Sequence, residues 1–143
     1  MTVPWVSIVV LAGVSQLGIV AGSLAIPRVL RWRDDLARLR PLTRQIFWTY
    51  AAYIWCTNLA FGLVSTFAPK WLLDGTPLAG AVCGFIALYW GARVVIQFAY
   101  FDRNDAPKGP LFALAEAILV GLFLFLTLVF GALAVQHFGG FGP

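Results

Sequence analysis

The chain has 143 residues, of which 61% are hydrophobic and 11% are charged, and its formal net charge is +4. Soluble domains are about 45–50% apolar and about 25% charged, so a soluble helical bundle of this composition would lack the polar side chains that cover a water-exposed surface. The sequence therefore predicts an all-α integral membrane protein, and its basic residues, which lie between apolar segments, indicate membrane orientation rather than nucleic-acid binding.

Four apolar segments follow one another along the chain. They cover residues 3–26, 45–67, 78–101 and 111–136. At about 1.5 Å of rise per residue, each segment is longer than the roughly 30 Å hydrocarbon core of a bilayer. No basic residue precedes the first segment, unlike a secretory signal peptide, so we expect it to be a span. The expected fold is a single transmembrane domain over residues 1–143, a bundle of four transmembrane helices.

The joint between the first and second segments is rich in arginine. Its apolar residues recur at the three- and four-residue spacing of a helix, at Val29, Trp32, Leu36 and Leu39. This pattern predicts a short amphipathic helix in the headgroup region of the membrane, and the alternative is an irregular basic loop. Four arginines are expected to face anionic lipid headgroups: Arg28, Arg31, Arg38 and Arg40.

Basic residues are distributed unevenly among the three joints. The first joint holds six arginines and the third holds Arg103 and Lys108, whereas the second holds only Lys70. With four spans, the first and third joints lie on the same side of the membrane, and the positive-inside rule assigns that side to the cytoplasm. We expect both termini on the outer face, with a bacterial inner membrane as the location.

Two ionisable residues lie well inside apolar segments, where a charge is costly and calls for a partner. They are Arg93 in the third segment and Glu116 in the fourth. Counted from the ends of an antiparallel hairpin, both lie at similar depth, which predicts an ion pair. Tyr89, Gln97 and Tyr100 fall near the same helix face as Arg93 and complete the expected polar cluster. Such a cluster either locks the hairpin, carries a proton or substrate, or binds a lipid headgroup or an acidic residue of a partner.

Small residues recur along several segments, as close helix packing in membranes requires. We expect the packing positions to be Gly18, Gly22, Gly80, Gly84, Gly91, Ala117 and Gly121. The pattern favours packing within the bundle, and the alternative is an interface with another chain.

The residues for metal, redox or haem chemistry are sparse. Cys56 and Cys83 form no CxxC pair, and His137 is the single histidine, a candidate only for a pigment or haem shared with another chain. We therefore predict bound lipid but no cofactor, and no catalytic role. The sequence favours a small accessory or scaffold subunit that packs against other membrane proteins. The alternatives are a lipid-, quinone- or pigment-binding protein and a minimal transporter that uses the polar cluster.

Overall fold

The computed structural model describes residues 3–101 and 108–139, and within them every regular element is a helix. The prediction of an all-α protein is confirmed. In chain order the elements are α1 (Val3–Ser23), α2 (Ile26–Val29), α3 (Trp32–Ala37), α4 (Pro41–Phe67), α5 (Pro69–Leu72), α6 (Pro77–Ala99) and α7 (Pro110–Phe138). Three of the long helices, α4, α6 and α7, begin at a proline, whose fixed φ and missing N–H suit the first helical turn.

Three stretches of the described chain are helical, long and apolar enough to cross a membrane: Pro4–Val29, Pro77–Ala99 and Pro110–Phe138. Helices of this kind are the mark of an integral membrane protein. The fourth long helix, α4, has 27 residues and is therefore about 40 Å long. It is less apolar than the other three, because its first turns carry Thr43, Arg44 and Gln45.

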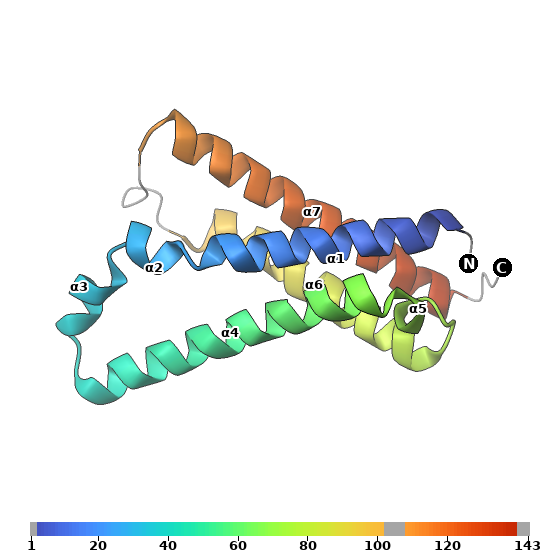
Figure 1. Cartoon of the computed structure of the whole chain (residues 1–143), viewed down its shortest axis with the longest axis horizontal. Coiled ribbons are helices and arrows are strands. Elements are labelled where there is room, and N and C mark those ends of the chain that lie inside the picture. The colour runs from blue at the N-terminus through green and yellow to red at the C-terminus, as the bar shows by residue number, and fades with distance from the viewer. Residues whose placement is uncertain (1–2, 102–107, 140–143) are drawn as a thin grey trace.

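The long helices form two antiparallel pairs, α1 with α4 and α6 with α7. Figure 1 shows the beginning of α1 and the end of α7 at one end of the molecule, near α5. The short helices α2 and α3 lie at the opposite end, where α6 ends and α7 begins. The two arginine- and lysine-containing joints therefore share one end of the bundle, although Arg103 lies outside the described residues.

The α1–α4 pair is held close by glycine. A Cβ atom placed on Gly13 would lie 2.6 Å from the backbone nitrogen of Thr66, and one on Gly62 would lie 2.7 Å from Leu17 Cδ2. Since these separations are too short for real Cβ atoms, only glycine lets α1 and α4 approach this closely at these points.

The buried residues of α4, α6 and α7 lie in one half of the bundle. The buried residues of α4 fall between Asn58 and Ser65, those of α6 between Ala79 and Trp90, and those of α7 between Phe123 and Leu133. We call this part the closed half. The remaining parts, residues 41–57 of α4, 91–99 of α6 and 110–122 of α7, contain no buried residue. We call them the open half, and Figure 1 shows α4 and α7 diverging from α1 there.

The first joint differs from its prediction as one amphipathic helix. Arg31 adopts a left-handed conformation with φ of 50°, which an α-helix cannot accommodate, so the joint contains two short helices, α2 and α3. Trp32 packs edge-on against Phe47 and Trp48 of α4, with ring centroids 4.9 and 6.0 Å away. The apolar stripe is also divided: Leu36 is buried, whereas Val29 and Leu39 are exposed. The aromatic contacts therefore fasten α3 to the beginning of α4.

The turn before α6 is built around Thr76. Its hydroxyl accepts a hydrogen bond from the Ala79 amide at 3.1 Å, which caps the helix. The same hydroxyl and the Thr76 amide donate to the Asp74 carboxylate at 2.7 and 2.9 Å. These two hydrogen bonds hold the pKa of Asp74 below its usual value.

The glycine contact between α1 and α4 gives a matched pair of substitutions. Gly13→Ala is expected to destabilise the protein by about 1–3 kcal/mol, since the added methyl group forces the two backbones apart. Gly18→Ala should be neutral or slightly stabilising, because nothing lies within 4 Å of the added Cβ and alanine favours a helix. Thermal unfolding of both variants in detergent checks this. Equal melting temperatures for the two would contradict the contact.

Candidate functional site

A buried amide joins three helices at the centre of the bundle. Gln16 of α1 is fully buried. Its Nε2 donates to the Ser65 hydroxyl of α4 at 3.4 Å, and its Oε1 accepts from the Trp90 indole nitrogen of α6 at 3.2 Å. Polar groups in the interior of a membrane protein hold helices together in this way, because an unpaired amide in hydrocarbon is costly.

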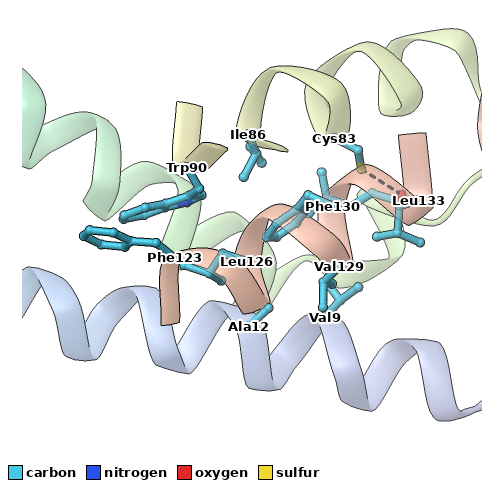
Figure 2. Packing of buried hydrophobic residues seen from close by; sticks show 11 residues of the cluster. Val9, Ala12, Cys83, Ile86, Trp90, Phe123, Leu126, Val129, Phe130 and Leu133 are labelled. Atoms are coloured by element: carbon cyan, nitrogen blue, oxygen red, sulfur yellow. Dashed lines mark hydrogen bonds between the residues drawn. The ribbon is translucent and has the colours of Figure 1, made fainter. Parts of the chain in front are cut away.

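The fourth long helix joins this layer through an aromatic contact. Figure 2 shows the Trp90 ring lying over Phe123 of α7, with centroids 5.1 Å apart and planes inclined by 29°. Val9 and Ala12 of α1 extend the core toward the chain ends, on the side of Val129 (Figure 2). The layer of Gln16, Ser65, Trp90 and Phe123 thus closes the bundle where the open half begins.

Arg93 lies at the boundary between the two halves. Its guanidinium carbon is 5.6 Å from the centroid of the Phe123 ring, a cation–π contact. Within the described residues, no carboxylate oxygen lies within 4.0 Å of its nitrogen atoms, and no hydrogen bond to its guanidinium is formed. The expected ion pair with Glu116 is therefore not formed in this structure.

The register of α6 against α7 explains this difference. Gly91 faces Thr127 and Gly84 faces Ala134, a pairing that brings Phe123 rather than Glu116 to the level of Arg93. Glu116 lies seven residues earlier in α7 and accepts a hydrogen bond from Gln97 Nε2 at 3.1 Å. The depth of each residue, counted from the helix ends, correctly predicted the antiparallel pairing of α6 with α7. It misplaced Glu116 relative to Arg93 by about two helical turns.

The tyrosines of the expected cluster lie apart from each other. Tyr89 packs against Phe61 of α4 with centroids 5.4 Å apart. Asn58 lies about one turn before Phe61 on α4, and Arg93 lies one turn after Tyr89 on α6. Tyr100 lies at the end of α6 and is 81% exposed. Arg93, Tyr89 and Asn58 therefore form one group, Gln97 and Glu116 form a second, and Tyr100 belongs to neither.

The expected small-residue positions divide into two sets. Gly80, Gly84 and Gly91 of α6 lie against α7, with a Cβ on Gly80 only 2.8 Å from that of His137. The other set faces away from the rest of the chain: a Cβ on Gly18, Gly22 or Gly121 meets nothing within 4 Å, and Ala117 is exposed. Among the described residues, the glycines of the first set contact another helix, whereas Gly18, Gly22 and Gly121 do not.

The candidate ligands for metals and pigments are dispersed. His137 binds the Leu133 carbonyl through Nδ1, and its Nε2 is buried without a hydrogen-bond partner among the described residues. A pigment outside the bundle would reach Nε2 only after the ring rotates. Cys56 and Cys83 are both free. No group of three or more His, Cys, Asp or Glu side chains in residues 3–101 and 108–139 is placed to hold a metal ion.

The arginines expected to face lipid are all exposed and lie at one end of the molecule. They are Arg28, Arg31, Arg38 and Arg40. Arg33 and Arg44 are exposed in the same region. This end therefore presents a dense cationic surface.

Comparison with protein-family models, with curated proteins and with solved structures found no match for this chain.

Gln16 is the central residue that the sequence analysis missed. It is an amide in the middle of an otherwise apolar segment, between Ser15 and Leu17. A strong hydrogen-bonding group at such a position seeks a partner on another helix. That pattern was sufficient to single out Gln16, although its partners could not be named without the helix register.

A double-substitution cycle tests the buried amide. Gln16→Leu leaves the Trp90 N–H unpaired and is expected to destabilise the protein by about 1–3 kcal/mol. Trp90→Phe removes the donor, and Gln16→Leu combined with Trp90→Phe should lose less than the sum of the two single variants. Thermal unfolding in detergent gives the coupling free energy. Strict additivity would show that the two side chains do not interact.

Proposed function

We propose that this protein is a small, non-catalytic accessory subunit that packs against another membrane protein through the outward face of α1. The proposal includes four transmembrane spans, formed by α1, α4, α6 and α7, in a bacterial inner membrane. Because the basic joints lie at one end of the bundle, we also propose that this end faces the cytoplasm and that both termini face outward.

The observation that carries the proposal is the set of small residues that the chain itself leaves uncovered. Gly18, Ala21, Gly22 and Ala25 recur at helical spacing near the end of α1, and all four are exposed. A smooth helix face of this kind allows another helix to approach closely and gain van der Waals contact, which drives association in lipid.

Several polar residues of the interior form hydrogen bonds between helices, and this supports a non-catalytic role. Gln16, Ser65 and Trp90 bond to one another across three helices, and Gln97 bonds to Glu116. These groups serve to set the positions of helices. A transporter or enzyme would need polar groups aimed at a shared space, and within residues 3–101 and 108–139 only Arg93 and its neighbours are arranged in that way.

Recognition of anionic lipid is a second proposed property. The exposed arginines of the first joint support it, because clusters of basic side chains at a cytoplasmic membrane surface attract acidic headgroups. Trp32, Phe47 and Trp48 lie among these arginines, and aromatic rings favour the membrane–water interface. This property requires no partner protein.

The orientation is tested by labelling engineered cysteines. Arg33 and Lys70 are exposed at opposite ends of the bundle. We expect a membrane-impermeant thiol reagent to label Lys70→Cys from the outer side and Arg33→Cys only after the membrane is opened. Labelling of both positions from the same side would contradict the four-span topology.

The accessory role is tested with Gly22→Leu, compared with Ala132→Leu on an exposed position of α7. Both variants should fold, since nothing in the chain lies within 4 Å of a Cβ on Gly22 and Ala132 is exposed. After mild-detergent purification from the native membrane, we expect Gly22→Leu to lower partner recovery by about tenfold, as a steric penalty above 1 kcal/mol implies. Ala132→Leu should recover the partner normally. If both variants retain the same proteins in the same yield, the α1 face is not the interface.

A further inference from the structure

Arg93 is a cation within a membrane helix that the rest of the described chain does not neutralise. It lies six residues before Ala99, the last residue of α6, which is about 9 Å along the helix. Its ring contact with Phe123 leaves its N–H groups unpaired. A guanidinium at this depth is costly unless its N–H groups meet an anion or water.

Two further polar side chains gather beside it. Tyr89 precedes Arg93 by one helical turn on α6. It packs against Phe61 of α4, which follows Asn58 by about one turn. Asn58 of α4 is only 7% exposed, yet its Oδ1 has no hydrogen-bond partner among the described residues. The Asn58 amide, the Tyr89 phenol and the Arg93 guanidinium thus lie together where α4 and α6 separate. Among the described residues, Asn58 Oδ1 and the guanidinium have no hydrogen-bond partner.

The surroundings of this group connect it to lipid. Phe61 of α4 packs against Tyr89, and beyond Asn58 and Trp90 neither α4 nor α6 buries a residue toward the joint end. Exposed side chains on these parts of α4 and α6 include those of Ile54 and Ile96. The exposed arginines of the first joint lie at the end toward which the helices diverge, so anionic groups are concentrated there.

We propose that Arg93 and Tyr89 form a binding site for a phosphate group at the inner end of the open half. The guanidinium donates to two phosphate oxygens, a geometry that its planar fork favours, and the Tyr89 hydroxyl donates to a third. Asn58 acts as a positioning residue for Tyr89. The phosphate belongs either to the headgroup of a phospholipid whose acyl chains lie along the open half, or to a soluble phosphate compound.

The charges around Arg93 favour an anion from outside the chain. Glu116 is held by Gln97 rather than by Arg93. The long arginine side chain can extend its charged end toward the headgroup level while its stem stays in apolar surroundings. This site is independent of the proposed accessory function, because a phosphate group can occupy it in the isolated protein.

The experiment measures binding of two probes to the full chain purified in detergent: phosphatidylglycerol by native mass spectrometry, and inorganic phosphate by thermal shift and by competition with the lipid. Arg93→Met is expected to weaken binding by about tenfold or more, the effect of losing charge-assisted hydrogen bonds. Tyr89→Phe should weaken it by about twofold to tenfold, the effect of losing a neutral one. Lys70→Met, which removes an exposed cation of α5 at the opposite end of the bundle, is the matched control and should weaken binding less than twofold.

The two probes distinguish the sources of the phosphate. Arg93-dependent binding of phosphatidylglycerol without competition by millimolar phosphate supports a lipid headgroup, whereas Arg93-dependent stabilisation by inorganic phosphate supports a soluble compound. If neither probe binds, or if Lys70→Met weakens binding as much as Arg93→Met, the site is disproved. It is also disproved if Arg93→Met leaves both probes unaffected but loses a co-purifying protein, since Arg93 would then pair with an acidic residue of a partner. If Arg93→Met does not fold, the Tyr89→Phe variant tests the site instead, because it keeps the ring that packs against Phe61 and removes only the hydroxyl. Unchanged binding of both probes to Tyr89→Phe would then disprove the site.

Discussion

The buried Gln16 amide is the interaction on which the rest of the bundle depends. Helices in a membrane gain little from apolar burial, because lipid tails are as apolar as leucine side chains. An amide has strong directional preferences, however, and an unpaired one is costly in hydrocarbon. Gln16 is satisfied only when Ser65 and Trp90 face it together, so it fixes the rotation and register of α1, α4 and α6 at one level.

Most of the other contacts extend from that level in one direction, although Trp55 of α4 also donates to the Val20 carbonyl of α1 on the opposite side. The glycine contact of Gly13 with α4 lies one turn from Gln16, and the stacking of Trp90 on Phe123 brings in α7. The core then continues only toward the chain ends, where the two helix pairs stay in contact. Toward the basic joints the same helices separate, so the chain combines a rigid half with a half whose surfaces are left for other molecules.

The sequence predicted the positions of the helices better than their contacts. Proline and the capping Thr76 mark helix starts through backbone chemistry, which acts within a few residues and can be read locally. The partner of Arg93 depends instead on the register of α6 against α7, which Gly84, Gly91 and the facing residues of α7 set through side-chain fit. The break at Arg31 was also missed, because a left-handed residue other than glycine leaves no clear pattern in the sequence.

Because α4 lies partly in the closed half and partly in the open half, a tilt of this helix in the closed half moves its beginning in the open half. Its buried part ends at Asn58, and the seventeen residues from Thr57 back to Pro41 extend as an unbroken helix about 25 Å long. Because Trp32 and Leu36 attach α3 to the far end, any tilt at the anchor is transmitted to the arginine-bearing joint. A tilt of about 10° would displace that joint by about 4 Å, a movement that leaves the hydrogen bonds around Gln16 near the pivot almost undisturbed.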